Sequence, residues 1–127
     1  MIRLHRVYDT AQAGHEPRFL VERLWPRGLK KRDLPVDGWL KEAAPSTALR
    51  KWFNHDPARW EAFRERYFRE LEARPEAWRA LLDAAGRGDV TLLYSSRDTE
   101  HNNALALREF LTAKLKGNAA ATRKQAA

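Results

Sequence analysis

The spacing of hydrophobic residues along the chain predicts an alternation of strands and helices. Residues 2–8 alternate in part between apolar and polar side chains, which is typical of a half-buried strand. Residues 19–25 are rich in β-forming residues and are more continuously apolar, as in a strand that is covered on both faces. Pro26 and Gly28 end that run. A third apolar run, at residues 90–95, predicts another buried strand.

Helical spacing occupies the segments between and after these strands. Ser46 is expected to cap a short helix that stops at Asn54, a residue suited to the left-handed conformation. Asp56, followed by a proline, is expected to open a longer helix with an inward stripe of aromatic residues. A third helix should follow Pro75, and residues 97–100 should lead into a final one. The aromatic stripe indicates a hydrophobic core.

Strands separated by helices predict a single α/β domain, with a small, mostly parallel sheet and helices packed on it. The folded domain is expected to span residues 1–116. Residues 117–127 are small and polar without periodicity, so we expect a disordered C-terminal tail. Residues 36–44 fit either a short helix or a short strand, and the sequence does not decide between them.

Composition excludes several classes of chemistry. The chain has no cysteine, so disulfides, thiolate metal sites and thiol nucleophiles are not available. The four histidines show no metal-ligand spacing, and the sequence contains no glycine-rich phosphate loop, so we predict neither a metal site nor a cofactor. The first residues do not resemble a secretory signal, and no apolar run is long enough to cross a bilayer. We therefore expect a cytoplasmic protein without membrane association.

The formal net charge is +7, and most of the excess belongs to the expected domain. A positive field of this size attracts phosphates and acidic surfaces without specifying one partner. A basic cluster, Arg27, Lys30, Lys31 and Arg32, follows the second predicted strand and is of the kind that contacts nucleic-acid backbones. The same cluster is equally typical of a solvated surface, and no helix-turn-helix follows it.

One candidate ligand site lies where two of the predicted strands end. In an open parallel sheet, ligands bind beyond the carboxyl ends of the strands. If the second and the last predicted strands are neighbours, they bring together polar side chains from both strand ends and from the start of the final helix. These residues are Arg23, Trp25, Arg27, Tyr94, Ser95, Ser96, Arg97, Asp98, His101 and Asn102. Arginines there suit a phosphate or carboxylate, although pairing of Arg23 or Arg27 with nearby acidic residues is an equally good explanation.

A second cluster surrounds the short helix and consists of Ser46, Arg50, His55 and Asp56. An imidazole beside an arginine and a carboxylate suits acid or base catalysis near neutral pH. The simpler interpretation makes Ser46 and Asp56 helix caps and His55 part of a turn.

Five short motifs occur together along the chain. They are Arg6-Val7-Tyr8-Asp9, residues 20–28 with their Trp-Pro-Arg-Gly ending, Ala44-Pro45-Ser46 with Leu49-Arg50, His55-Asp56-Pro57, and residues 91–94 through 98–102. In these motifs the chain resembles the bacterial YeaO-like family, a domain of unknown function of the DUF488 type, over almost all of residues 1–116. Glu22 and Asn54 stand where the family pattern would have aspartate and glycine. The resemblance implies the α/β fold and the choice of site, but no catalytic residues, because the family has no assigned reaction.

The first functional hypothesis is therefore a site for a small anionic ligand or substrate, such as a nucleotide or phosphorylated metabolite. Arg23 and Arg27 would bind the anion, with Trp25, Ser46, Arg50 and Asn102 as further ligand contacts. If the protein is an enzyme, which the sequence leaves open, the candidate catalytic residues are His55, Asp98 and Tyr94. The alternative is a nucleic-acid-associated or regulatory protein that binds through Arg27, Lys30, Lys31 and Arg32. A protein–protein adaptor is a third hypothesis, and the sequence does not predict the oligomeric state.

Overall fold

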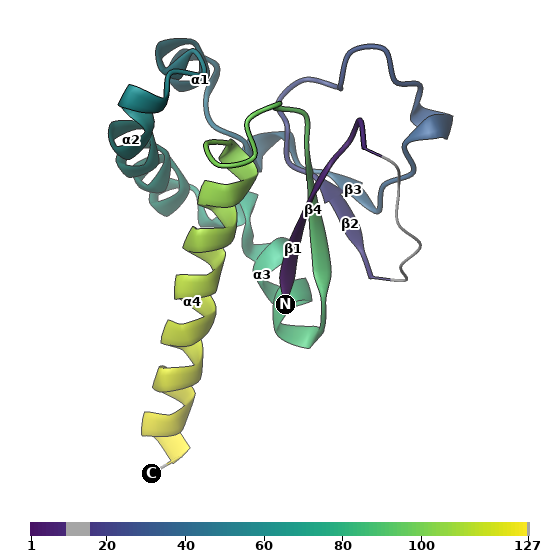
Figure 1. Ribbon diagram of the computed structural model, residues 1–127. Coiled ribbons are helices and arrows are strands. Elements are labelled where there is room, and N and C mark those ends of the chain that lie inside the picture. Colours follow the sequence, from purple (N-terminus) through teal and green to yellow (C-terminus); the bar gives the residue numbers. More distant parts are fainter. Residues whose placement is uncertain (10–15, 127) are drawn as a thin grey trace.

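The computed structural model describes the backbone of residues 1–9 and 16–126, and the side chains as far as residue 117 (Figure 1). The chain forms a mixed α/β domain around one four-stranded sheet, as the sequence predicts. The strands are β1 (Ile2–Arg6), β2 (Arg18–Leu20), β3 (Gly38–Trp39) and β4 (Val90–Tyr94). All pairings are parallel and the spatial order is β1-β4-β2-β3. The expected loop at residues 9–14 lies mostly outside the described residues.

Strand β4 is the centre of the sheet. It pairs with β1 from Ile2↔Val90 onward, and with β2 from Arg18↔Thr91 onward. All five of its residues are buried, which explains why it is a continuous apolar run rather than an alternating one. The second and last predicted strands are therefore neighbours, and their carboxyl ends meet at one edge.

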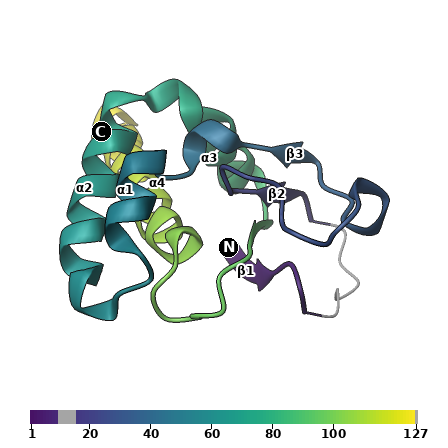
Figure 2. The same cartoon turned by 90° about the horizontal axis from the view of Figure 1, so that it is seen from above.

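Four α-helices pack on one face of this sheet (Figure 2). They are α1 (Thr47–Phe53), α2 (Trp60–Ala73), α3 (Arg79–Arg87) and α4 (Asn103–Ala126). Four single 3-10 turns connect these elements, at Lys31–Asp33, Lys41–Ala43, Pro57–Arg59 and Pro75–Ala77. None of the described helices has the length and apolar character that crossing a membrane requires.

The main hydrophobic core lies between the helices and the sheet. Phe63 and Tyr67 of α2, Leu92 of β4 and Leu107 of α4 are almost completely buried there. The Tyr67 hydroxyl donates a hydrogen bond to the Ala43 carbonyl oxygen, so this phenol is satisfied inside the core. The aromatic stripe of α2 is thus part of the core, as its helical spacing predicts.

The opposite face of the sheet is covered by a loop rather than by helices. Leu20 and Leu93 point to this side and pack with Leu34, Trp25 and Trp39. The indole N–H groups of the two tryptophans donate to backbone carbonyl oxygens, at 2.6 Å for Trp25 and 2.7 Å for Trp39. Residues 25–36 therefore form a loop that carries its own small hydrophobic cluster.

Two expectations about strands need correction. The strand expected at residues 19–25 ends at Leu20: the Val21 N–H still bonds to the Leu93 carbonyl oxygen of β4, but the carbonyl oxygens of residues 21 and 22 accept from side chains instead. The Val21 carbonyl accepts from the side chain of Asn103, and the Glu22 carbonyl accepts from the Trp39 indole. The undecided segment 36–44 forms both a two-residue strand, β3, and a 3-10 turn.

The predicted helix caps are confirmed. The Ser46 hydroxyl accepts from the Leu49 N–H, and the Asp56 carboxylate accepts from the Ala58 N–H. Asn54 adopts the left-handed conformation with φ 48°, and His55 follows with φ 54°. Asp56 caps a 3-10 turn, and α2 proper begins after that turn.

The final helix differs at both ends from its expected limits. It begins at Asn103, and the Asn102 side chain accepts from the Leu105 N–H as its cap. The helix continues through Ala126 in this structure, beyond the expected domain end at residue 116. Disorder of residues 117–127 stays a prediction.

Candidate functional site

A cavity of about 120 Å³ lies at the carboxyl ends of β2 and β4. Its walls come from the segments after these two strands, from α1 and α2, and from the start of α4. The lining residues are Glu22, Arg23, Ala44, Pro45, Arg50, Phe53, His55, Phe63, Ser95, Ser96, His101, Asn102 and Asn103. A wider and shallower groove adjoins it, lined by His55, Ser95, Ser96, Arg97 and Asp98. The site therefore lies where a parallel sheet is expected to bind ligands.

Arg23 lines the cavity, but its guanidinium is largely occupied by the protein itself. Nε donates to the Pro45 carbonyl oxygen at 2.9 Å, and one terminal nitrogen donates to the Ala44 carbonyl oxygen at 3.1 Å. The other terminal nitrogen is 3.9 Å from a carboxylate oxygen of Glu42. Arg23 thus fixes the segment that leads into α1, and this structural role competes with binding an anion.

Arg50 also lines the cavity, and its guanidinium is exposed. Within the described part of the chain it makes no hydrogen bond or ion pair. It projects from α1, and the Ser46 cap fixes the first turn of that helix. Of the arginines predicted from the sequence, Arg50 is the one that faces the cavity without a protein partner.

His55 stands between the cavity and the shallow groove and lines both. Its side chain is exposed, and its ring lies 6.4 Å from that of Phe53. The two successive left-handed residues, Asn54 and His55, reverse the chain sharply after α1. This turn is what brings the imidazole to the edge of the site.

Glu22 is a half-buried carboxylate in the cavity wall. Its Oε1 accepts the Ser95 backbone N–H at 2.8 Å and the Ser95 hydroxyl at 3.1 Å. Burial raises the pKa of this carboxyl above its ordinary value, while the bonds from Ser95 and the charges of Arg50 and His55 act in the opposite direction. An acidic group that costs energy to ionise thus lies beside two basic side chains.

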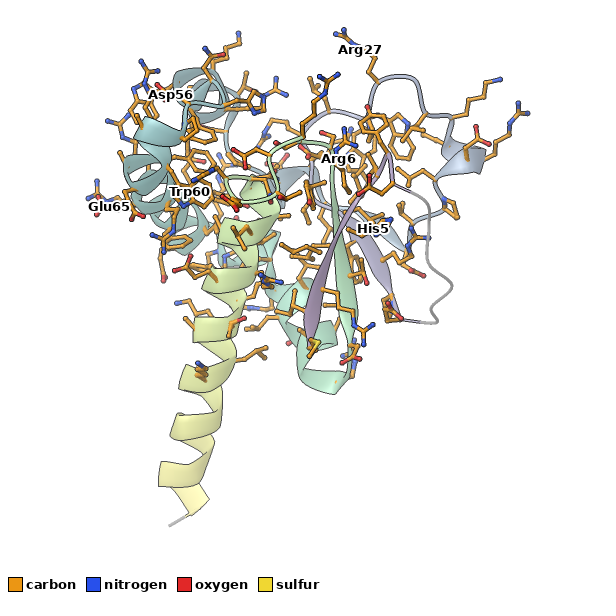
Figure 3. All side chains as sticks on the ribbon, viewed as in Figure 1. His5, Arg6, Arg27, Asp56, Trp60 and Glu65 are labelled. Carbon is orange, nitrogen blue, oxygen red and sulfur yellow. The ribbon has the colours of Figure 1, made fainter. Side chains whose placement is uncertain are left out.

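Asp98 organises the loop between β4 and α4. Its carboxylate accepts the backbone N–H groups of Glu100 at 2.8 Å and His101 at 3.0 Å, and lies 2.9 Å from His101 Nδ1. These bonds hold the pKa of Asp98 below its ordinary value, and the bond from the Glu100 N–H contributes most. The paired His101 ring packs edge-on against Trp60, which extends from α2 toward α4 in Figure 3, at 5.4 Å between centroids. Asp98 is therefore the partner of His101 and not of His55.

Four of the predicted site residues, Trp25, Arg27, Ser46 and Tyr94, do not line the cavity. Tyr94 is 5% exposed and belongs to the main core, and burial raises its pKa. Trp25 packs with Trp39 on the opposite face of the sheet. The Ser46 hydroxyl and N–H bond to the carboxylate of Glu70, at 2.5 and 2.8 Å. Arg27 extends away from the body of the molecule (Figure 3).

Asn102 touches the cavity, but both ends of its side-chain amide are occupied. Its nitrogen donates to the Asp98 carbonyl oxygen at 3.0 Å, and its oxygen accepts from the Leu105 N–H at 2.8 Å. The residue is 2% exposed. Its role is to join the loop after β4 to α4.

The predicted nucleic-acid cluster is an exposed segment. Arg27, Lys30, Lys31 and Arg32 are all exposed, and none of them forms an ion pair with a described residue. They lie on the loop that covers the sheet face opposite the helices. This basic loop and the cavity are therefore separate features of the molecule.

A metal site is not formed by the part of the chain that the structure describes. Across residues 1–9 and 16–117, no three carboxylate or imidazole side chains come together in a way that would hold an ion. His15 lies outside the described residues.

Comparison with known proteins places the chain in a family. A family model described as "Inactive DUF488-N3 subclade" matches residues 1–127. "Uncharacterized protein YeaO" of Escherichia coli (strain K12) is 46% identical over 110 residues, which are 87% of this chain and 96% of that protein. The chain belongs to the YeaO-like DUF488 family. "Uncharacterized protein Rv3073c" of Mycobacterium tuberculosis (strain ATCC 25618 / H37Rv) is 36% identical over 87% of this chain and 92% of its own length. No solved structure matches the chain.

In this member of the DUF488 family, one residue of the cavity wall, Glu22, is not predicted as a ligand contact. From the sequence, Glu22 is only one of the acidic residues that could pair with an arginine, whereas His101 already belongs to the cluster expected at the strand ends. A signal for Glu22 was present, because an acidic residue within a nearly continuous apolar strand pattern has to be accommodated in a partly buried place. The pairing of His101 with Asp98 three residues earlier is a local signal of the same kind.

Proposed function

We propose that this protein binds a small anionic ligand, carrying a phosphate or carboxylate group, in the cavity at the ends of β2 and β4. The observation that carries the proposal is the guanidinium of Arg50, which lines the cavity and makes no ion pair with a described residue. A guanidinium suits carboxylates and phosphates, because it offers several directed N–H donors in one plane. The positive net charge of the chain would draw such ligands toward the site.

The shallow groove beside the cavity supports the same ligand chemistry. Arg97 lines this groove with an exposed guanidinium, and among the described residues it too makes no ion pair. The cavity of about 120 Å³ is smaller than the about 300 Å³ at which pockets for drug-sized ligands begin. A small molecule would fill it, or one end of a longer ligand would enter it while the rest lay along the groove toward Arg97.

Binding without turnover fits the site better than catalysis. Among the candidate catalytic residues, Tyr94 is in the core, and Asp98 shares the shallow groove with His55 but is bonded to His101 instead. The matching family model is described as an inactive subclade, which favours the same choice. The expected cytoplasmic location, which rests on the sequence, would give such a protein access to phosphorylated metabolites.

The test is a thermal-shift screen against inorganic phosphate, sugar phosphates, nucleotides and dicarboxylates, followed by calorimetry of the responding compounds. A ligand at about a hundred times its dissociation constant adds about 2.7 kcal/mol of stability, a shift of several degrees. Arg50→Gln should weaken binding at least about tenfold. Lys51→Gln, which removes the same charge from the next position of α1, should leave it unchanged. Equal effects of the two substitutions would show that only the general field attracts the anion.

The basic loop supports a second candidate function, the binding of nucleic acid. Four exposed cations at positions 27, 30, 31 and 32 without ion pairs to described residues would contact phosphates without reading sequence. Fluorescence anisotropy with short DNA and RNA should then show affinity that falls steeply with salt. A double change of Lys30 and Lys31 to Ser should reduce the salt dependence, whereas Arg50→Gln should not. Binding that is weak at low salt, or insensitive to salt, would exclude this function.

A further inference from the structure

Glu22 and Arg50 line one cavity with opposite charges and do not contact each other. Both residues belong to the cavity wall, yet no nitrogen of Arg50 lies within 4.0 Å of a carboxylate oxygen of Glu22. An arginine and a glutamate that served only to neutralise each other would be expected to form a direct ion pair. The two charged groups are therefore not used by each other, and both lie in the wall of one cavity.

The carboxylate of Glu22 is fixed in orientation by one of its oxygens. Oε1 accepts two hydrogen bonds from Ser95, while no described residue donates to Oε2. All completely buried side-chain polar atoms of the described residues have a hydrogen-bond partner, so Oε2 must keep contact with open space. Since Glu22 lines the cavity, Oε2 is the oxygen of this carboxylate that is left to accept a bond from a ligand.

The surroundings of the Glu22 carboxylate favour a ligand group that is cationic or that carries an N–H donor. Phe53 and Phe63 form apolar walls, with their rings stacked at 4.4 Å between centroids. In such surroundings a carboxylate gains from a direct donor more than it would in water. The raised pKa of Glu22 agrees with this, since it shows that the carboxylate lacks full compensation for its burial.

We propose that the ligand is amphoteric, with an N–H donor group, such as a primary ammonium, bound by Glu22 Oε2 and an acidic group bound by Arg50. This inference rests on the proposed anion site and specifies what else its ligand must carry. Glu22 is then the residue that distinguishes an amino acid or a phosphorylated amine from a simple acid of the same size. The small cavity requires the two groups to be separated by only a few bonds.

The experiment compares matched probes that differ only in an amino group. Calorimetry with O-phosphoethanolamine and ethyl phosphate, and with β-alanine and propionate, measures the contribution of that group directly. In at least one pair the amine should bind about tenfold more tightly, which is about 1.4 kcal/mol. Glu22→Gln should remove this preference while the protein still binds the simple acid, and Arg50→Gln should weaken both members of the pair.

Glu65→Gln serves as the matched control for Glu22→Gln. Glu65 is an exposed carboxylate on α2 that points away from the molecule (Figure 3), so its loss changes the net charge equally without touching the cavity. The inference is overturned, and the anion site stands, if the simple acids bind as tightly as the amines. It is also overturned if Glu22→Gln and Glu65→Gln change the preference for the amine by the same amount. If the wild-type protein binds no member of either pair, the inference fails, whereas the anion site fails only if the thermal-shift screen also finds no ligand that depends on Arg50.

Discussion

The two faces of the sheet are covered in different ways. The face under the helices is filled by large side chains, including Phe63, Tyr67 and Trp78, which are almost completely buried. The opposite face has a smaller cluster under a loop, and there two indole N–H groups bond to backbone carbonyl oxygens of the segment after β2. Burial of apolar area stabilises the first face, whereas specific hydrogen bonds hold the second.

This difference bears on the site, because the cavity lies where the two coverings meet. Phe53 and Phe63 reach it from the helix side. Glu22 lines it from the segment after β2, and its carbonyl oxygen is held by the indole of Trp39, which belongs to the loop face. The helix face should therefore determine the stability of the domain, while the loop face should determine the position of Glu22.

The largest effect is expected from Phe63→Ala on the helix face. Phe63 is 2% exposed and stacks against both Phe53 and Trp60, so the substitution leaves a cavity among fixed neighbours. It should destabilise the protein by about 3–5 kcal/mol in urea denaturation. Phe68→Ala, at a partly buried position of the same helix, should cost clearly less. A loss similar to that of Phe68→Ala would show that the stacked aromatics do not dominate the core.

An intermediate effect is expected from Trp39→Phe on the loop face. The substitution keeps an aromatic ring but removes the donor to the Glu22 carbonyl, and it should cost about 1–2 kcal/mol. Trp25→Phe removes the corresponding bond to Leu29 and should cost a similar amount. Only Trp39→Phe should also change the affinity of the cavity for anions, measured by calorimetry. Equal effects of the two variants on affinity would contradict the expectation that the Trp39 indole positions Glu22.

The smallest effect is expected from Glu22→Gln and depends on pH. The pKa of Glu22 is higher in the folded protein than its ordinary value of 4.5, so folding takes up a proton between these two pKa values. The contribution of Glu22 to the free energy of unfolding therefore falls as pH rises from its ordinary pKa to its higher pKa in the folded protein. The variant should lack this fall and should melt a few degrees above the wild type at neutral pH. The two proteins should converge near pH 4.

Asp98→Asn tests a carboxyl group whose pKa is shifted in the opposite direction to that of Glu22. The pKa of Asp98 is lowered in the folded state, so its contribution to stability is present at neutral pH and is lost as pH falls through the folded pKa. The variant should melt below the wild type at neutral pH and approach it in acid. Two variants that respond to pH in the same direction would contradict the assignment of a raised pKa to one carboxyl and a lowered pKa to the other.

The helix face of the fold could be predicted from the sequence because its signals are local. The spacing of aromatic residues in α2, the Ser46 cap and the left-handed Asn54 each depend on neighbours within one or two turns. The adjacency of β2 and β4 is only a condition of the sequence-based hypothesis, and the structure supplies it, because parallel pairing by itself does not determine the order of the strands. The loop face could not be predicted, since the Trp39–Glu22 bond joins residues 17 positions apart that do not belong to one repeating element.

The sequence predicts a candidate site at the carboxyl ends of two strands, and a cavity lies there, but the contacts of the residues around it are not evident from the sequence. The sequence indicates which arginines lie near the strand ends, but not what their donors bind. Arg23 binds the backbone carbonyls of residues 44 and 45, a contact that depends on where the chain returns after β3. The positions of Arg27, which points away from the molecule, and of Arg50, which lines the cavity, depend in the same way on the path of the chain. Glu22 is identified as a residue of the cavity wall only from the structure, in which its carboxylate bonds to Ser95.

The central place of β4 sets the order in which this protein can fold. Its partners β1 and β2 lie at the beginning of the chain, and the pairing of Ile2 with Val90 closes a loop of almost the whole domain. Such non-local pairing makes folding slow compared with a helical bundle of similar length. On the ribosome, the first two strands must wait without their partner until residues 90–94 have been made, so we expect the sheet to assemble as a late step, after α2 and α3 have been synthesised.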